Sequence, residues 1–311
     1  MIADGRGAWR KQMNEPQVTP RATVGLIGVG LLGSALAERL WEHHVPVLGF
    51  DVESARRQAL EASGGQASTS AADVFATCDL VLLSLPTSEI AQEVVTQNVA
   101  GMIPGATVID TTTGNPEEML AIGERLEQRG VNYIEATVAG SSEQLRRGHA
   151  TLLVGGADAR LASVQWLLRI LGEKYFHLGP VGSASRFKLV HNLLLGLHRA
   201  VLAEGLTFAE SLGFDPDVTL EILQQTPAVS GVMATKGRKM VAADYALQAR
   251  LSQHLKDVRL ILSEAERTGA STPLSEVHQA LLQQAEQLGL GEVDNSAVIE
   301  VYRRQLTDGA T

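Results

Sequence analysis

Cysteine is almost absent from this chain, and its scarcity limits the sites available. Cys78 is the one cysteine among 311 residues, so no intramolecular disulfide can form. With no second thiolate beside it, Cys78 cannot start a zinc site, and we expect no metal centre. A chain without disulfides fits a reducing compartment, which predicts a cytoplasmic location.

Basic runs and long uninterrupted hydrophobic stretches are also missing. The chain carries 35 acidic and 26 basic side chains, mixed along the sequence, for a formal net charge of -9. A nucleic-acid backbone therefore has no basic patch to bind. The most apolar stretch, residues 187–208, is interrupted by polar groups that include Lys188, Asn192 and Glu204, too many for a membrane span. Neither nucleic acid nor a membrane is an expected partner.

The composition is that of a globular protein, and its length favours two domains. Hydrophobic residues make up 45% of the 311 residues and charged residues 20%, which is enough to bury a core in each of two domains. Residues 1–20 are polar and carry both charge signs, which predicts a disordered tail rather than a secretory signal. We expect one domain over residues 21–182 and another over residues 183–311.

The first expected domain alternates short β-rich runs with helical patterns. Strands are expected at residues 22–27, 46–50, 80–84, 107–109, 133–136 and 151–154. Helices are expected at residues 31–43, 54–62, 89–97, 116–128 and 159–171. Asn115 as cap and Pro116 in the first helical position mark one of these starts. The alternation predicts an α/β fold with a doubly wound, mainly parallel sheet of the Rossmann type.

Strand patterns end at Gly182, and a long helix then leads into an all-α domain. Residues 183–212 contain no proline, and apolar side chains cover nearly the whole circumference, so this helix must be buried on most sides. Sharing between domains or between subunits would bury it, which predicts a homodimer or homotetramer. Residues 213–216, G-F-D-P, predict a stop and a turn. Further helices are expected at residues 251–268, 273–287 and 296–304.

Three glycines follow the first expected strand in the pattern G-x-G-x-x-G. Gly28 permits a tight turn, Gly30 lets a pyrophosphate approach the backbone, and Gly33 lets helix and sheet pack closely. The helix that begins with Leu31 and Leu32 offers free N–H groups and a partial positive charge to phosphates. A strand before and a helix after predict a dinucleotide site rather than a glycine turn that binds nothing.

The choice between the two nicotinamide dinucleotides depends on Asp51, which closes the second expected strand. Its carboxylate can accept hydrogen bonds from both ribose hydroxyls of NAD, whereas the 2′-phosphate of NADP would meet like charge. Arg56 and Arg57 are the counter-argument, but their place inside the following helix predicts solvent-facing charges. We expect NAD, with NADP as the less favoured alternative.

Lys188 and Asn192 lie four residues apart in the long helix, so they share one of its faces. An ammonium group is costly in so apolar a segment unless it has a partner or a purpose. Desolvation would lower its pKa toward working pH, where it could exchange a proton with a substrate hydroxyl. On spacing alone, the simpler interpretation is that Lys188 reaches the surface and that Asn192 packs between helices.

Seven separated segments form a series along residues 24–302. They are GLIGVGLLG at 25–33, LPT at 85–87, DTTT at 110–113, EATVAGS at 135–141, KLVHN at 188–192, KDV at 256–258 and DNSAV at 294–298. The series resembles the β-hydroxyacid dehydrogenases, the group of 3-hydroxyisobutyrate dehydrogenase, tartronate semialdehyde reductase and, more distantly, 6-phosphogluconate dehydrogenase. The resemblance implies an NAD-dependent oxidoreductase that moves a hydride between the cofactor and a small β-hydroxy acid or its semialdehyde.

The resemblance also implies roles for individual residues. Lys188 would be the general acid/base, and Asn192 would hold the substrate beside it. Four residues would lie at the cofactor: Leu85, Pro86, Thr113 and Lys256. Taken singly, these four could instead end a strand, help to cap a helix or form an exposed ion pair.

One segment departs from the family pattern. Where these enzymes usually carry A-P-V-S-G-G to grip the substrate carboxylate, this chain has A-T-V-A-G-S at residues 136–141. Ala139 replaces the usual serine, the backbone around Gly140 remains available, and Ser141 supplies a hydroxyl two residues later. We expect these three residues to bind substrate, with a standard substrate held weakly or in a different pose.

Two other functions stay open at this point. An imine reductase would share the fold and the cofactor, but such enzymes generally lack the lysine, so Lys188 argues against it. A noncatalytic dinucleotide-binding protein is suggested by the altered Ala139 and Ser141 alone.

Overall fold

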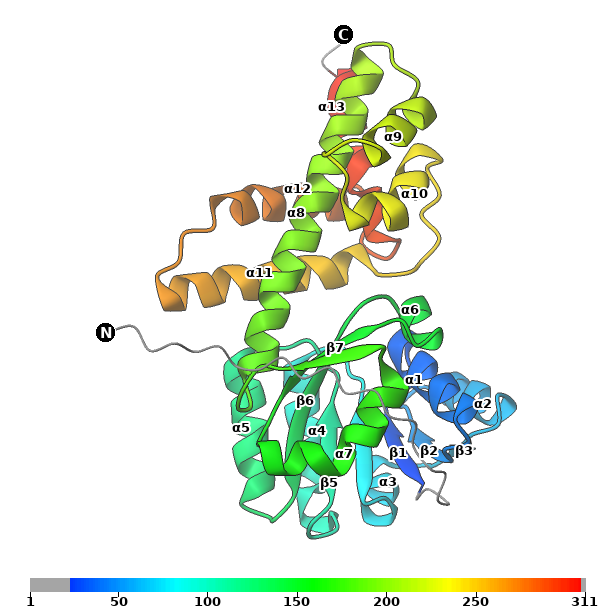
Figure 1. The fold of residues 1–311 in the computed structure, drawn as a ribbon, viewed down its shortest axis with the longest axis vertical. Helices are drawn as coiled ribbons and strands as arrows, with labels where there is room; N and C mark the ends of the chain where they lie inside the picture. The colour runs from blue at the N-terminus through cyan, green and yellow to red at the C-terminus, as the bar shows by residue number, and fades with distance from the viewer. Residues whose placement is uncertain (1–22, 309–311) are drawn as a thin grey trace.

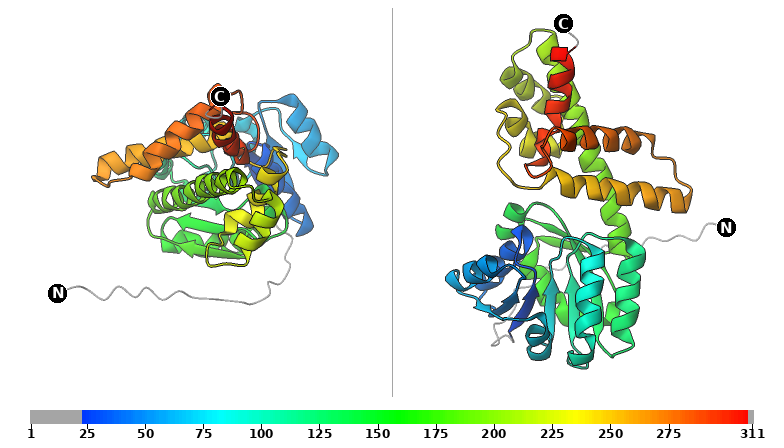
Figure 2. Two further views of the ribbon diagram at one scale, coloured as in Figure 1. Left: turned by 90° about the horizontal axis from the view of Figure 1, so that it is seen from above. Right: turned by 180° about the vertical axis from the view of Figure 1, so that it is seen from behind.

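The computed structural model describes residues 23–308, which form a sheet region followed by a helical region (Figure 1). The helix α8 (Ser183–Ser211) runs from the sheet region into the helical region, as Figure 1 and the right view of Figure 2 show. The tail expected at residues 1–20 lies outside the described residues, as do residues 309–311.

The sheet has eight strands in the order β3-β2-β1-β4-β5-β6-β7-β8. They are β1 (Val24–Ile27), β2 (Val47–Phe50), β3 (Gln66–Ala67), β4 (Leu80–Leu83), β5 (Thr107–Asp110), β6 (Asn132–Ala139), β7 (Thr151–Gly155) and β8 (Lys174–His177). Neighbouring strands are parallel except β6 and β7, which pair antiparallel. The predicted doubly wound, mainly parallel sheet is confirmed.

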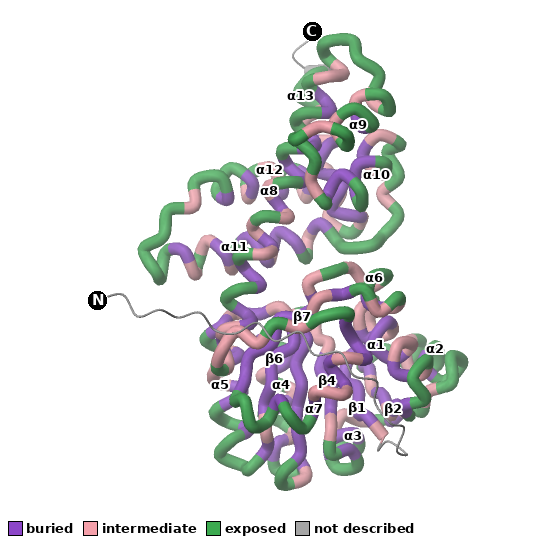
Figure 3. Tube along the Cα trace, viewed as in Figure 1, coloured by how far each residue is buried: buried purple, intermediate pink, exposed green. Residues whose placement is uncertain are grey.

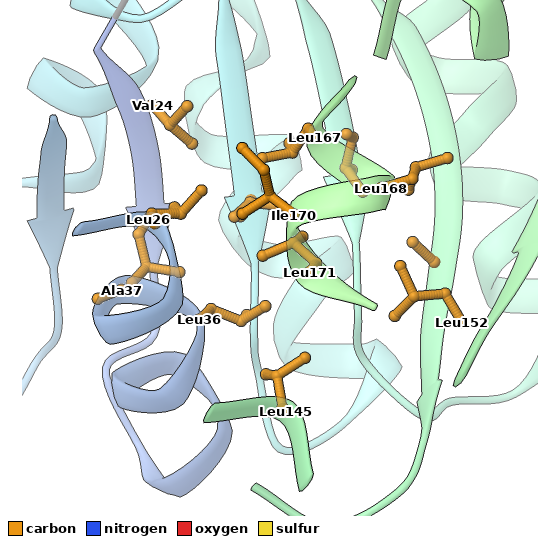
Figure 4. Close-up of a cluster of buried hydrophobic side chains, with 14 of the residues drawn as sticks. Val24, Leu26, Leu36, Ala37, Leu145, Leu152, Leu167, Leu168, Ile170 and Leu171 are labelled. Carbon is orange, nitrogen blue, oxygen red and sulfur yellow. The ribbon is translucent and has the colours of Figure 1, made fainter. Parts of the chain in front are cut away.

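Helices cover both faces of this sheet because successive strand residues point to opposite sides. Leu26 belongs to one hydrophobic cluster with α1 and α7, and Ile27 belongs to another with α3, α4 and α5. Figure 4 shows Leu26 facing Leu36 of α1 and the side chains of α7. The helices of this region are α1 (Leu31–Glu42), α2 (Ser54–Ala62), α3 (Ala71–Thr77), α4 (Ser88–Asn98), α5 (Pro116–Glu127), α6 (Ser142–Arg146) and α7 (Asp158–Leu171).

The helical region packs shorter helices around the second half of α8. These are α9 (Pro216–Gln224), α10 (Arg238–Val241), α11 (Leu251–Thr268), α12 (Pro273–Gln287) and α13 (Ile299–Asp308), with a π turn at Met233–Gly237 and a 3-10 turn at Asn295–Val298. A third hydrophobic cluster joins them, built on residues such as Leu206, Leu255 and Leu282. No helix of residues 23–308 is long and apolar enough to cross a membrane.

Two helices of this region differ from the expectations. Gly213, with a φ of +84°, lies in the turn that follows the long helix, as the stop and turn signals predict. No helix was expected directly after that turn, but Asp215 accepts a hydrogen bond from the Val218 N–H and Pro216 opens α9. The helix expected at residues 296–304 is split into the 3-10 turn and α13.

The expectation that α8 is buried on most sides is wrong for the single chain. Lys188, Asn192 and Arg199 face the interior. On the opposite side, four side chains are 51–69% exposed: Val190, Leu194, Val201 and Phe208. Figure 3 shows buried and exposed positions alternating along the helix. We call these four residues the α8 stripe, and within one chain it remains open to solvent.

Candidate functional site

A cleft of about 880 Å³ lies between the carboxyl ends of the strands and the helical region. Its walls come from the segments that follow β1, β2, β4 and β5, from β6, and from the facing sides of α8 and α11. In doubly wound sheets, ligands bind at this edge because the connections after neighbouring parallel strands diverge there. The cleft is therefore the place to look for each predicted residue.

The three glycines of the first loop occupy three different environments. Gly28 has a φ of +92°, and a Cβ there would lie 2.2 Å from the Ser84 carbonyl oxygen. A Cβ on Gly33 would lie 2.0 Å from the Gly28 oxygen. A Cβ on Gly30 would meet the Arg56 Nη1 at 3.6 Å and no other atom within 4 Å. The protein's own packing thus requires the first and third glycines, whereas Gly30 faces open space in the cleft.

This open space fits the pyrophosphate of a dinucleotide. Gly30 is the N-cap of α1 and supplies no side-chain cap, so N–H groups of the first turn stay available to an anion. Leu31 and Leu32 line the cleft beside it, while Gly33 lies behind them against the sheet. Among residues 23–308, no group of three or more His, Cys, Asp or Glu side chains is placed to hold a metal ion.

Asp51 lies at the end of β2 and is held firmly. Its carboxylate accepts the N–H of Val29 at 2.8 Å and that of Glu53 at 2.9 Å. The expectation that both following arginines simply face solvent is wrong. Arg56 lines the cleft with Nη1 3.4 Å from the Asp51 carboxylate, and Arg57 donates to the Asp51 carbonyl at 2.6 Å. The end of β2 therefore presents a carboxylate with a guanidinium beside it.

Residues after β4 and β5 meet the helical region at the other end of the cleft. Leu85, Pro86 and Thr113 all line it. The Lys256 ammonium, from α11, donates to the Thr113 oxygen at 2.6 Å and to the Pro86 oxygen at 3.2 Å. Gln253 also donates to Pro86, at 3.0 Å. Lys256 thus bridges two loops and does not itself line the cleft.

Lys188 is 7% exposed and lines the cleft from α8. Its amine donates to the Val138 carbonyl of β6 at 2.6 Å. Burial lowers the pKa of this amine to about 8, and the Asp257 carboxylate acts in the opposite direction. The alternative of a lysine that reaches bulk solvent is therefore wrong. An amine with this pKa is present in both protonation states near neutral pH.

Asn192 also lines the cleft, and Asp257 fixes its orientation. The Asn192 Nδ2 donates to Asp257 Oδ2 at 2.9 Å. Asp257 is 8% exposed, so the alternative of an exposed ion pair with Lys256 is wrong for this carboxylate. One N–H of the Asn192 amide is engaged by Asp257, so its second N–H remains available to a ligand, while its carbonyl oxygen lies 3.1 Å from the His191 Nδ1.

Only part of the segment that departs from the family pattern lines the cleft. Gly140 and Ser141 line the cleft together with Val138, whereas Ala139 does not. The Ser141 hydroxyl oxygen accepts the N–H of Gln144 at 3.1 Å, and the Gln144 side chain accepts the N–H of Ser141 at 2.8 Å. This reciprocal pair begins α6, so the hydroxyl that appears at Ser141 already has a structural task.

Two family models together match most of the chain. One, described as the NAD binding domain of 6-phosphogluconate dehydrogenase, matches residues 23–179. The other, described as NAD-binding of NADP-dependent 3-hydroxyisobutyrate dehydrogenase, matches residues 182–302. The chain belongs to the β-hydroxyacid dehydrogenase family. This β-hydroxyacid dehydrogenase is therefore an oxidoreductase that uses a nicotinamide dinucleotide.

Individual relatives agree with this assignment. The 2-(hydroxymethyl)glutarate dehydrogenase of Eubacterium barkeri is 29% identical over 286 residues, which covers 90% of this dehydrogenase and 95% of the relative. The chloroplastic glyoxylate/succinic semialdehyde reductase 2 of Arabidopsis thaliana is 29% identical over 284 residues, covering 90% and 79%. A solved 3-hydroxyisobutyrate dehydrogenase from Salmonella typhimurium shares the fold with a TM-score of 0.84 at 23% identity, covering 90% and 100%.

Sequence reasoning missed a carboxylate that anchors α8. Glu135 of β6 is fully buried and accepts the N–H of Gly182 at 2.6 Å and the hydroxyl of Ser185. Lys188 follows Ser185 by three residues, so this contact helps to set the position of the dehydrogenase's amine above β6. The only available signal was that Glu135 opens one of the recognised segments.

Three further cleft residues were also missed: Arg199, His254 and Asn295. Arg199 could have been found from spacing, because it follows Lys188 by 11 residues and therefore shares its face of α8. His254 and Asn295 come from other elements of the helical region, and no sequence pattern links them to Lys188.

Proposed function

We propose that this dehydrogenase oxidises a small β-hydroxy acid to its semialdehyde, and reduces the semialdehyde, with Lys188 as the general acid/base. The observation that carries the proposal is a buried amine that lines the cleft and has a pKa of about 8. When bound, the nicotinamide ring accepts the hydride from the carbon that bears the hydroxyl.

The side chains around the cleft supply proton transfer and orientation. In oxidation, the neutral Lys188 amine takes the hydroxyl proton, and in reduction its ammonium form returns it. The Val138 carbonyl holds the amine by a 2.6 Å hydrogen bond. Asn192, oriented by Asp257, holds the substrate oxygen, and Gly140 and Ser141 receive the carboxylate. Enclosure between the two regions excludes water and limits the substrate to productive orientations.

Replacement of Lys188 tests this role. In Lys188→Met, we expect NADH binding, followed by fluorescence titration, to persist while turnover falls by about 10²- to 10⁴-fold. Lys239→Met is a matched control, because Lys239 is a largely buried lysine whose amine donates to the Ala246 carbonyl at 2.8 Å, outside the cleft. Turnover retained in Lys188→Met would contradict the assignment. Cyclic imines, the substrate class of imine reductases, provide the negative control in the same assay.

We propose NAD as the preferred cofactor, bound by Gly28, Gly30, Leu31 and the neighbouring loop residues. Asp51 supports this choice, because its carboxylate lies where a 2′-phosphate would meet like charge. The nearby Arg56 is the group that would favour NADP. The ratio of kcat/KM for NAD over NADP should exceed one and should fall in Asp51→Asn. A ratio below one in the unmodified protein would refute the preference.

Three further expectations remain proposals. The division into a dinucleotide-binding domain over residues 21–182 and a substrate and dimerisation domain over residues 183–311 is supported by the position of the last strand, β8. A homodimer or homotetramer is supported by the α8 stripe, because exposed apolar side chains of this kind are usually buried against another subunit. A cytoplasmic location is supported by the single cysteine, Cys78.

A further inference from the structure

Arg199 is a buried cation without a hydrogen-bond partner for two of its nitrogens. It is 5% exposed, lines the cleft, and neither Nε nor Nη1 has a partner. Burying a charged guanidinium in this state is strongly unfavourable unless something compensates it. Because most buried polar groups have a hydrogen-bond partner, an unpaired one that lines a cleft points to a partner supplied from the cleft.

The carboxylates nearest to Arg199 are already engaged elsewhere. Asp294 accepts two bonds from the Lys236 ammonium, at 2.8 and 2.9 Å, and also the N–H groups of Gln248, Ala249 and Ser296. Asp257 accepts from Asn192 through Oδ2, and its Oδ1 lies 3.2 Å from the Lys256 ammonium without a hydrogen bond. The charges of both carboxylates act on Arg199 from a distance, but neither carboxylate accepts a hydrogen bond from its Nε or Nη1.

The two imidazoles packed near Arg199 supply no negative charge either. Burial, with the Arg199 charge as the next cause, lowers the pKa of His254 well below its ordinary value and that of His278 to about 4. Both rings are therefore neutral at physiological pH. Among the charged side chains that line this part of the cleft, Lys188 and Arg199 are basic and Asp257 is acidic. An anion that enters here can therefore approach Arg199 without meeting a second carboxylate of the lining.

The spacing along α8 places Arg199 at a fixed offset from the reacting group. Eleven residues separate it from Lys188, which is about 16 Å along the helix axis at 1.5 Å per residue. The Asp257 carboxylate acts on both the Lys188 amine and the Arg199 guanidinium, so both groups face the same part of the cleft. Asn192 and Leu195 line the cleft between them. The wall thus presents an amine, an amide, an apolar side chain and a guanidinium in that order.

We propose that the natural substrate carries a second carboxylate, at the end of a short carbon chain, and that Arg199 binds it. The inference rests on the proposed function, because it locates the reacting carbon at Lys188. A carboxylate suits a guanidinium whose Nε and Nη1 have no partner, since its two oxygens can accept charge-assisted hydrogen bonds from the planar fork of N–H groups. Leu195 contacts the chain between the two charged ends. Arg199 is then a specificity-determining residue.

Three alcohols that differ in one group provide the test. They share the unit HOCH₂–CH–COO⁻ and carry methyl (3-hydroxyisobutyrate), propyl (2-(hydroxymethyl)pentanoate) or carboxyethyl (2-(hydroxymethyl)glutarate). We expect the carboxyethyl compound to exceed the length-matched propyl compound in kcat/KM by about 10- to 100-fold. In Arg199→Met, this ratio should fall to near one, mainly through KM of the diacid. An unmodified-enzyme ratio near one, or equal losses for both substrates in Arg199→Met, would overturn the proposal.

Binding without turnover separates this inference from the proposed function. Glutarate should raise the Tm of the NAD-loaded protein more than butyrate does, and Arg199→Met should remove the difference. If glutarate binds selectively but no alcohol is oxidised, the proposed function fails and the carboxylate site stands. If 3-hydroxyisobutyrate is oxidised and the diacid has no advantage, only this inference fails. Should Arg199→Met not fold, Arg199→Lys, which keeps the charge but loses the two-pronged geometry, should also lower the ratio, and an unchanged ratio there would refute the proposal.

Discussion

Replacing Asp257 by asparagine should shift the pH profile of alcohol oxidation to lower pH. The proposed mechanism needs Lys188 in its neutral form to accept the hydroxyl proton. Burial lowers the pKa of this amine to about 8, and the Asp257 carboxylate opposes that shift by favouring the ammonium form. Removing the negative charge therefore favours the neutral amine, so oxidation should become possible at lower pH.

The size of the shift follows from the fraction of neutral amine. With a pKa of about 8, about a tenth of the amine is neutral at pH 7 and about nine-tenths at pH 9. Oxidation in the unmodified enzyme should thus rise with pH and level off above about pH 9, whereas reduction should fall over the same range. Loss of one nearby carboxylate lowers such a midpoint by about one pH unit. At pH 7, the neutral fraction would then rise from about a tenth to about half.

A second variant with the opposite expectation makes the test specific. The Lys256 charge lowers the pKa of Lys188, so Lys256→Met should move the midpoint to higher pH. The assay is kcat/KM for 3-hydroxyisobutyrate oxidation between about pH 6 and pH 10 at constant ionic strength, because kcat/KM reports groups of the free enzyme. Midpoints that stay unchanged in both variants, or that move in the same direction, would refute Lys188 as the titrating group.

Three further outcomes concern stability and assembly. Gly196→Ala places a methyl 2.5 Å from a buried histidine ring and should lower the free energy of unfolding in urea by about 1–3 kcal/mol. Gly231→Ala, where the new methyl has no atom within 4 Å, should leave that free energy unchanged. Equal effects of the two substitutions would contradict the packing argument. Asp294→Asn removes the carboxylate partner of the buried Lys236, which then keeps only its bond to Gln248. This change should lower the free energy of unfolding by about 3–5 kcal/mol, and an unchanged free energy would show that the ion pair is dispensable. Val201→Glu, in the α8 stripe, should yield monomers in sedimentation, and a monomeric unmodified protein would remove the oligomer proposal.

Much of the fold could be predicted from local patterns, but one pattern, a capping residue followed by proline, was interpreted in two ways. Asn115 with Pro116 was predicted to begin a helix, and α5 begins there. Asp215 with Pro216 has the same cap chemistry but was predicted to form a turn, and α9 begins there. Short elements were not predicted, for a different reason. Strand β3 (Gln66–Ala67) has two residues, too few to display the alternation on which strand prediction depends.

The site was predicted where its chemistry is local and missed where partners come from distant segments. Lys188 and Asn192 reveal themselves by spacing within one helix. Their supports do not, since Asp257 is 65 residues from Asn192 along the chain, and Glu135 is 50 residues from Ser185. Such pairs exist only once the sheet and helices are packed, and one sequence contains no sign of which distant residues will meet.

The anchored first turn of α8 has a mechanical consequence. Glu135 ties the start of this rod to the sheet, and a continuous helix bends little over its length. Measured from Gly182 at 1.5 Å per residue, Lys188 lies about 9 Å along the rod and Phe208 about 39 Å. If α8 rotates about its anchored first turn, the position of Phe208 moves roughly four times as far as that of Lys188. The helical region can then swing to admit a ligand while the proton carrier keeps nearly the same place over β6.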